Sequence, residues 1–301
     1  MSPYPSCAQA ARQPLTSARP CTGLREGVWG YEGFHRPGPA PRERLHLPTP
    51  AVSLVLLLEG RLEPSAPAAR VPPGAPLLAG PRTESLTLRY GAGARGVRVL
   101  LAPWAVHALT GGPVDRLAGR VVPAGELLGP LAGRLTAVLA DAPDWAGSCA
   151  LLDGALARLL PGPPEPAPPV LRAWRALVRS RGTLPVAELA REAGWCRSQL
   201  GRRFQAQVGL TPKAVARVLR LREAVRLLGA GEPVATVAVA AGFHDQAHFA
   251  REFKAMTGHT PRRFRAEWDA DGFRKEDNED EEAEFLQEWL PVPTAESSSV
   301  R

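Results

Sequence analysis

The most constraining feature of this chain is a pattern that occurs twice between Leu184 and Arg265. The two copies are Glu188–Phe204, followed by a Gly-Leu-Thr-Pro segment, and Thr236–Phe253, followed by a Gly-His-Thr-Pro segment. Their internal glycines, Gly194 and Gly242, lie 48 residues apart, and the two Thr-Pro pairs lie 49 residues apart. The near-constant offset predicts two copies of one supersecondary unit.

Each copy predicts two helices joined by a tight turn. Gly194 and Gly242 suit the turn, since glycine accepts the positive φ that an abrupt helix exit requires. After each turn, a pair of apolar residues at positions i and i+4 predicts one inward helix face, and the pairs are Leu200 with Phe204 and Phe249 with Phe253. Two helix-turn-helix units on one chain predict two neighbouring contacts with a DNA duplex.

Helical spacing places polar and cationic side chains opposite the inward pairs, where they can reach base edges and phosphates. We expect base-edge readout by Ser198, Gln199 and Arg202 in the first unit and by Gln246, His248 and Arg251 in the second. We expect phosphate contacts from a second set of cations, which comprises Arg197, Arg203, Lys254, Arg262 and Arg263.

These residues resemble the DNA-binding domain of AraC/XylS-type transcription regulators over residues 170–268, about a third of the chain. The residues that carry the resemblance are Leu189-Ala190, Gly194, Leu200, Phe204, Gly209-Leu-Thr-Pro212, Arg220–Ala224, Leu227-Leu228, Val237-Ala238, Gly242-Phe243, Asp245-Gln246, Phe249, Phe253-Lys254, Gly258–Pro261 and Phe264-Arg265. The resemblance implies seven helices in two subdomains, with units at about 184–208 and 233–257. It also implies a linker helix from about Lys213 to Leu228, and recognition helices that enter successive major-groove segments.

Three residues depart from the family pattern. Cys196 stands where the family usually has a serine N-cap, and a thiol is a poorer acceptor than a hydroxyl. We interpret it as a weak cap, with redox sensing as the alternative. Ala247 replaces a usual serine, and Gly201 within the recognition helix costs about 1 kcal/mol relative to alanine. We therefore expect the first helix-turn-helix unit to recognise DNA less strictly than the second.

Charge is concentrated in the same region. Residues 170–268 carry 18 Lys/Arg against 7 Asp/Glu, whereas residues 269–301 carry 3 against 11. A basic domain of this kind is the electrostatic footprint of a protein that binds phosphate backbones.

The fold class expected is α+β, with a β-rich sensor and dimerisation domain at residues 25–160 before the helical domain. Alternating or apolar segments at 52–58, 85–90 and 96–101 predict strands, and Leu/Ala spacing at 104–109, 127–139 and 145–160 predicts helices. Short strands with such turns suggest a small antiparallel barrel or sandwich. The family resemblance implies a cupin-like sensor followed by dimerisation helices. We expect any sensor cavity to be lined by apolar strand residues.

Three segments are expected to lie outside these domains. They are a flexible leader at residues 1–24, a Pro-rich linker at 161–169 and an acidic disordered tail at 269–301. The tail ends in an apolar stripe that contains Phe285 and Trp289. A solvated tail is the first interpretation; the alternative is that it competes with DNA for the basic face or recruits a protein.

No enzyme motif is present in the sequence. It has no P-loop, no Gly-x-Ser-x-Gly, no dinucleotide fingerprint and no paired-carboxylate pattern. His35, His46 and His107 are far apart and form no His-x-His pair, so we predict no metal and no cofactor. The four cysteines have no Cys-x-x-Cys spacing, which indicates reduced thiols in a cytoplasmic protein, and no apolar run approaches the ~20 residues of a membrane span.

We therefore predict a sequence-specific regulator of transcription and no catalytic residue. The expected partners are double-stranded DNA, a small-molecule effector, a second copy in a homodimer, and RNA polymerase if the protein is an activator. Two alternatives stay open: a cupin-like enzyme fused to a regulatory domain, and a co-regulator that acts by protein contact and binds DNA weakly. The sequence does not identify the effector, the operator or the sign of regulation.

Overall fold

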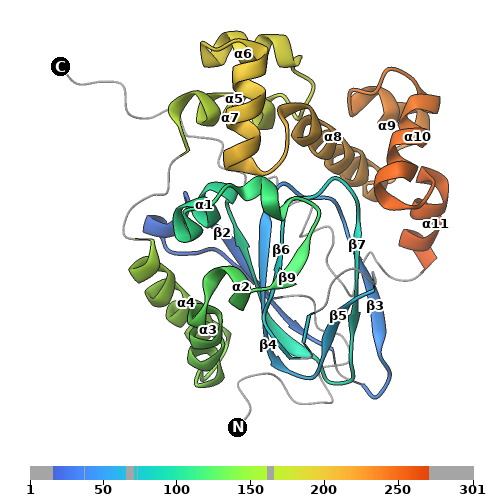
Figure 1. Ribbon diagram of the computed structural model, residues 1–301. Coiled ribbons are helices and arrows are strands. Elements are labelled where there is room, and N and C mark those ends of the chain that lie inside the picture. Colours follow the sequence, from blue (N-terminus) through green and yellow to red (C-terminus); the bar gives the residue numbers. More distant parts are fainter. Residues whose placement is uncertain (1–15, 37, 66–70, 73, 161–165, 271–301) are drawn as a thin grey trace.

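The computed structural model consists of a β-rich half followed by a helical half (Figure 1), and it describes residues 16–36, 38–65, 71–72, 74–160 and 166–270. Most of the expected leader, residues 161–165 of the expected linker and residues 271–301 of the acidic tail lie outside the described residues. No helix in the described part is long and apolar enough to cross a membrane.

The larger sheet has six antiparallel strands in the order β1-β2-β8-β4-β6-β9. The strands are β1 (Thr16–Ala18), β2 (Val28–His35), β4 (Val52–Glu59), β6 (Leu77–Ala79), β8 (Arg95–Leu101) and β9 (Val121–Pro123). The strands expected at 52–58 and 96–101 are β4 and β8, which pair side by side at the centre.

A second sheet of three antiparallel strands has the order β3-β7-β5, formed by β3 (Arg42–His46), β5 (Leu62–Pro64) and β7 (Leu86–Tyr90). The β-rich character expected for this half is confirmed. The two sheets pack through one apolar cluster, as in the sandwich alternative, and do not close into a small barrel. The edge strands β5 and β9 are only three residues long and end in Pro64 and Pro123. Proline has no N–H to donate, so these edges cannot extend a ladder from one sheet to the other.

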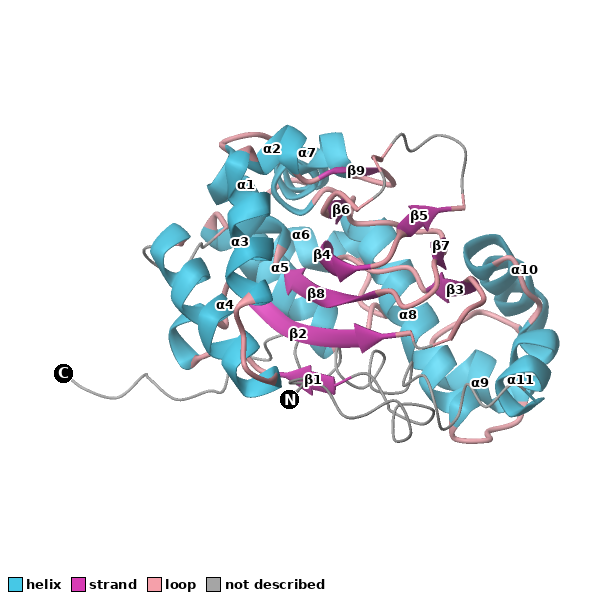
Figure 2. Cartoon of the chain, turned by 90° about the horizontal axis from the view of Figure 1, so that it is seen from below, coloured by secondary structure: helices cyan, strands magenta, loops and turns pink. Residues whose placement is uncertain are grey.

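Strand β4 is buried on both faces, which explains its continuous apolar run. Leu54 and Leu56 belong to the cluster shared with the helices, whereas Val55 and Leu57 belong to the cluster shared with the three-stranded sheet. The larger sheet is therefore the middle layer, between helices α1 to α4 and the smaller sheet (Figure 2).

The helices of this layer are α1 (Pro103–Thr110), α2 (Gly125–Leu128), α3 (Pro130–Ala140) and α4 (Trp145–Leu159), with short 3-10 turns η2 (Thr22–Leu24) and η3 (Val114–Leu117). They match the three predicted helical segments, except that Gly129 separates α2 from α3. Part of the expected leader is also ordered, because β1 pairs with β2 and Leu24 is buried. Its proline-broken sequence had indicated a flexible segment throughout.

The helical half contains the seven helices that the resemblance implied. They are α5 (Pro168–Arg179), α6 (Val186–Ala193), α7 (Arg197–Val208), α8 (Pro212–Gly229), α9 (Val234–Ala240), α10 (Gln246–Thr257) and α11 (Pro261–Ala270). Helix α5 takes in the last two residues of the expected linker, since Pro168 is tolerated in the first turn of a helix.

The first helix-turn-helix unit is joined to the β-rich half by an aromatic cluster. The ring of Trp174 on α5 stacks on Trp29 of β2 with centroids 5.5 Å apart. It meets Trp104 of α1 edge to face at 5.2 Å. Phe204 of α7 lies on the other side of Trp174, at 6.4 Å. One apolar core therefore runs from the larger sheet into the first unit.

The second unit meets the β-rich half elsewhere, through polar backbone contacts and one leucine. Arg222 of α8 is buried, and its Nε donates to the carbonyl of Pro48 at 3.3 Å. The N–H of Ser85 donates to the carbonyl of Met256 on α10 at 2.8 Å. Leu47 is buried in the apolar cluster of α8, α10 and α11. In Figure 1, α9, α10 and α11 accordingly lie beside the edge that carries β3 and β7.

Candidate nucleic-acid interface

The two predicted units have the same turn geometry. In the first, Gly194 ends α6 at φ +73°, and the N–H of Trp195 donates to the carbonyl of Ala190 at 3.0 Å. In the second, Gly242 has φ +77°, and the N–H of Phe243 donates to the carbonyl of Ala238 at 2.9 Å. This is the left-handed exit that glycine allows without steric cost, as the sequence predicted.

The inward pairs are buried as expected. Leu200, Phe204, Phe249 and Phe253 have no exposed surface, and each pair packs into the core of its own unit. Burial of these large apolar side chains fixes which face of α7 and α10 remains outward.

The outward faces carry most of the predicted base-reading side chains at the surface. Ser198, Arg202, Gln246 and Arg251 are exposed, and Gln199 is half-buried. All five residues predicted to contact phosphates are also exposed, namely Arg197, Arg203, Lys254, Arg262 and Arg263. Their roles toward DNA remain predictions, but none of these side chains is sequestered in a core.

His248 is placed differently from the other five candidates. Its ring meets Phe243 edge to face with centroids 5.8 Å apart, and its Nε2 lies 4.0 Å from Oε1 of Glu252. The side chain is half-buried against its own unit, whereas that of Arg251 is exposed. The role of His248 in base readout remains a prediction.

Glu252 is a functional candidate that sequence reasoning missed. Its carboxylate lies 2.9 Å from Nε of Arg217 and 3.7 Å from Nη2 of Arg220, both on α8. The guanidinium of Arg220 also lies over the ring of Phe243, 5.6 Å from its centroid. The group fixes α10 to the linker helix. The i, i+4 spacing of His248 and Glu252 could have suggested it, but the partners on α8 are distant in sequence.

The two recognition helices begin differently. At the start of α10, Oδ1 of Asp245 accepts from the N–H of His248 at 2.6 Å, and this bond lowers the pKa of the Asp245 carboxyl. At the start of α7, Cys196 makes no side-chain capping hydrogen bond, in agreement with the weak cap that the sequence indicated. Backbone N–H groups near the helix start, Gln199 foremost, lower the pKa of its exposed thiol.

Linker helix α8 connects the units and matches the predicted span within a residue at each end. Thr211 caps it, because its Oγ1 accepts from the N–H of Ala214 at 3.2 Å. Its 18 residues give a length of about 27 Å at 1.5 Å per residue. Successive major-groove faces of straight B-DNA are about 34 Å apart, which is longer than this rod.

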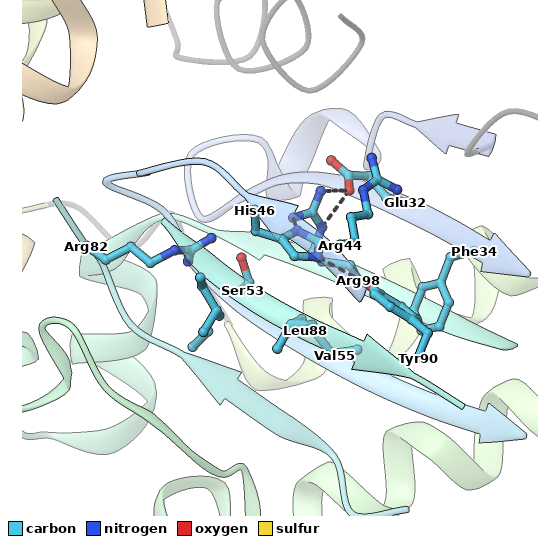
Figure 3. Close-up of a pocket in the computed structure, with 12 residues that line it drawn as sticks. Glu32, Phe34, Arg44, His46, Ser53, Val55, Arg82, Leu88, Tyr90 and Arg98 are labelled. Atoms are coloured by element: carbon cyan, nitrogen blue, oxygen red, sulfur yellow. Dashed lines mark hydrogen bonds and ion pairs between the residues drawn. The ribbon is translucent and has the colours of Figure 1, made fainter. Parts of the chain in front are cut away.

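A second candidate site lies between the two sheets of the β-rich half (Figure 3). Its space, counted with the open solvent at its mouth, is about 430 Å³. The lining residues are Glu32, Phe34, Arg44, His46, Ser53, Val55, Ala79, Arg82, Leu86, Leu88, Tyr90 and Arg98. The apolar strand residues expected to line a sensor cavity are present, and the charged side chains among them were not predicted. Strand alternation in the sequence does not identify these charged residues, because the packing of the second sheet decides which side chains face the pocket.

A chain of polar contacts crosses this pocket. Glu32 and Arg98 are directly opposed on β2 and β8, and Arg98 Nε donates to Glu32 Oε2 at 2.6 Å. Arg98 Nη1 lies 3.0 Å from Nδ1 of His46, whose Nε2 lies 3.0 Å from the hydroxyl of Tyr90. Arginine has no acceptor, so His46 Nδ1 accepts and its proton resides on Nε2, which donates to Tyr90.

The other two histidines set aside in the sequence lie outside this pocket. His35 ends β2, and His107 is on α1 with its Nδ1 2.7 Å from the carbonyl of Gly112. Among the described residues, no group of three or more His, Cys, Asp or Glu side chains could hold a metal ion.

Comparison with known proteins matches the second half of the chain. The family model described as a helix-turn-helix domain matches residues 189–267. The HTH-type transcriptional regulator MtrA of Neisseria gonorrhoeae is 35% identical over 83 residues, which are 27% of this chain and 28% of that protein. The match therefore spans little more than a quarter of this relative.

Two solved structures of one protein were also found. ToxT from Vibrio cholerae is 12% identical over 78% of this chain and 97% of its own, with a TM-score of 0.44. ToxT with a bound unsaturated fatty acid is 13% identical over 78% and 94%, with a TM-score of 0.42.

Proposed function

We propose that this protein is a sequence-specific DNA-binding transcription regulator, because residues 189–267 form a helix-turn-helix domain of the AraC/XylS type. The observation that carries the proposal is the pair of recognition helices α7 and α10, each with a buried apolar face and an exposed polar or cationic face. Each recognition helix enters one segment of the major groove, where the base edges present distinct donor and acceptor patterns.

Within the interface we assign two roles. The base edges are read by Ser198, Gln199 and Arg202 on α7 and by Gln246, His248 and Arg251 on α10. Arg197, Arg203, Lys254, Arg262 and Arg263 position phosphates and carry no sequence information of their own. If the linker sets the separation of the two recognition helices, either the subdomains splay or the duplex bends. We expect some bending, at a cost that depends on the DNA sequence.

The β-rich half is proposed to regulate the DNA-binding half through a small-molecule effector or through dimerisation. Its continuity with the first unit at Trp174 and its separate contacts with the second unit at Arg222 support this coupling. The partners are double-stranded DNA, the effector and, for an activator, RNA polymerase. The location consistent with this function is the cytoplasm.

The direct test is selection of bound fragments from a random DNA pool by the full-length protein. Recovery of a shared motif with two half-sites about one helical turn apart supports the proposal. Recovery of random sequence, or no binding at low salt, contradicts it.

Two variants then separate the assigned roles. Arg251→Ala is expected to weaken binding to the selected site by about 1–3 kcal/mol and to relax preference at one position. Arg262→Ala is the matched control, expected to weaken binding to selected and random DNA alike and to reduce the salt dependence by about one counterion. Equal losses on both DNAs for Arg251→Ala refute its role in reading bases.

A further inference from the structure

We propose that Arg220 joins the two helix-turn-helix units into one rigid body, so that the protein reads two half-sites at a single fixed spacing. The duplex, and not the protein, then deforms to meet both recognition helices. This role of Arg220 rests on the proposed function and specifies what sets the geometry of its two-part DNA site.

Arg220 lies on α8 at the boundary between the apolar cores of the two units. Figure 1 shows α8 between helices α5–α7 and helices α9–α11. Leu219 belongs to the apolar cluster that contains the first unit, whereas Leu221 belongs to the cluster of the second unit. Apolar burial is non-directional, whereas a hydrogen bond restricts both distance and angle. A polar contact with both units at this boundary therefore fixes their relative orientation more strictly than the apolar packing does.

The guanidinium of Arg220 contacts both units. Its Nη1 donates to the carbonyl of Gly182, in the turn between α5 and α6 of the first unit, at 3.1 Å. Its Nη2 lies 3.7 Å from the carboxylate of Glu252 on α10, and the group also lies over the ring of Phe243 in the turn of the second unit. Arginine presents its donors in a rigid planar fork, so this one side chain holds partners from both units in a fixed relation.

The two units also touch directly beside Arg220. A Cβ built on Gly242 would lie 2.6 Å from Cγ2 of Thr183, which is closer than real Cβ atoms come to a neighbour. Oγ1 of Thr183 donates to the carbonyl of Ser180 at 2.7 Å, and this bond fixes the rotamer that turns the methyl group toward Gly242. The equivalent glycine of the first unit, Gly194, has no described atom within 4 Å of its built Cβ. The close contact is therefore specific to the turn that faces the other unit.

The turn that accepts the hydrogen bond from Arg220 is itself fixed on the linker helix. A Cβ on Gly182 would collide with the backbone of Ala216, so the turn lies directly against α8. Nη1 of Arg181 donates to Oε1 of Glu223 on the same helix at 2.8 Å. The carbonyl of Gly182 therefore cannot move independently of α8.

A rigid connection between the units has a consequence for DNA. Helix α8 is about 27 Å long, and successive major-groove faces of straight B-DNA are about 34 Å apart. If Arg220 prevents the subdomains from splaying, the duplex has to bend before both recognition helices can enter it. Two base pairs added between the half-sites rotate one of them by about 70° and move it by about 7 Å. A rigid protein cannot follow that change.

The spacing test uses the full-length protein and duplexes that carry the selected motif with one or two base pairs added or removed between its half-sites. The wild-type protein should lose affinity about tenfold or more at two base pairs. Arg220→Lys keeps the positive charge near Glu252 but removes the planar fork, so this loss should shrink about threefold or more. Affinity for a duplex with one intact half-site should stay within about twofold of wild type, because each unit remains intact.

Arg217→Lys is the matched control for Arg220→Lys. Arg217 lies on the same helix and pairs with the same carboxylate of Glu252. In the described part of the chain, however, Arg217 makes no hydrogen bond or ion pair with the first unit. Arg217→Lys should therefore keep the wild-type preference for spacing.

Gly242→Ala tests the contact between the units from the other side. The added methyl group displaces Thr183, whereas Gly194→Ala brings a similar backbone strain, at φ +73° against +77°, without such a neighbour. Gly242→Ala should alter the preference for spacing, and Gly194→Ala should weaken binding at every spacing alike.

Bending is measured by energy transfer between dyes at the two ends of the selected duplex. Binding of the wild-type protein should raise the transfer efficiency, and binding of Arg220→Lys should raise it less, because its subdomains can splay. Unchanged transfer with the wild-type protein would show that the duplex stays straight and would overturn the rigid-body account.

The spacing measurements can overturn it in two further ways. An unchanged spacing preference in both Arg220→Lys and Gly242→Ala would mean that α8 or the β-rich half holds the units. An equal loss for Arg220→Lys at every spacing and on the single half-site would assign Arg220 to folding alone. A wild-type protein that binds no DNA contradicts the proposed function, whereas one that binds the selected motif at every spacing contradicts only the role of Arg220.

Discussion

Replacing Gly201 by alanine should stabilise the first recognition helix. Gly201 lies within α7, and a Cβ built on it meets no atom within 4 Å. The substitution therefore adds no clash, and its effect reduces to the helix propensity difference of about 0.5–1 kcal/mol. If the helix opens locally, that free energy corresponds to about two- to fivefold slower exchange of its amides.

Hydrogen exchange read by mass spectrometry on peptides that cover 197–208 measures this directly. Gly194→Ala is the matched control, because Gly194 also has open space around its built Cβ but has φ +73°. Alanine there is strained by about 1–2 kcal/mol, so its α6 and α7 peptides should exchange faster. Unchanged or faster exchange in Gly201→Ala, or protection in Gly194→Ala, would refute the reasoning that conformation alone decides these two positions.

Three further predictions concern the core, the helix caps and the thiols. Trp174→Ala should cost about 3–5 kcal/mol in denaturant unfolding, and Trp174→Phe much less because the buried indole N–H makes no hydrogen bond. Asp245→Ala should speed amide hydrogen exchange at the start of α10, whereas Asp245→Asn should not. Folding lowers the pKa of the Asp245 carboxyl. The wild-type cap is therefore present above the pKa of the unfolded chain and is lost as the pH falls through the pKa of the folded protein. Iodoacetamide should label Cys196 long before Cys149 at neutral pH, because the Cys196 pKa is lowered and burial raises the pKa of Cys149 to about 12; equal labelling rates in peptide mass spectrometry would contradict this.

The helical half could be predicted closely because its signals are local. Gly194 and Gly242 mark their turns, and the i, i+4 pairs mark the buried faces, within a dozen residues of one another. The exposure of Arg202 and Arg251 follows from the same periodicity. The half-burial of His248 does not follow from this periodicity. Its neighbour Glu252 is held by arginines of α8, and no local sequence pattern connects those arginines to α10.

The pocket could not be predicted because it is made by pairing across long sequence separations. Arg44 on β3 and Arg98 on β8 are 54 residues apart, and strand alternation alone does not say which face of each strand another sheet will cover. Arg44 belongs to the three-stranded sheet that faces Arg98 across the pocket, and of its strands only β7 was predicted, as the segment 85–90.

The tryptophan at position 174 carries a practical consequence for anyone who divides this chain. It sits on the first helix after the junction, yet its ring is fully buried between Trp29 and Trp104 of the preceding half. Cleavage between the halves would expose the indole of Trp174 and leave an apolar patch on the released fragment, next to its first recognition helix. A truncated DNA-binding domain prepared for DNA-binding assays should therefore self-associate unless this apolar patch is first replaced by polar residues.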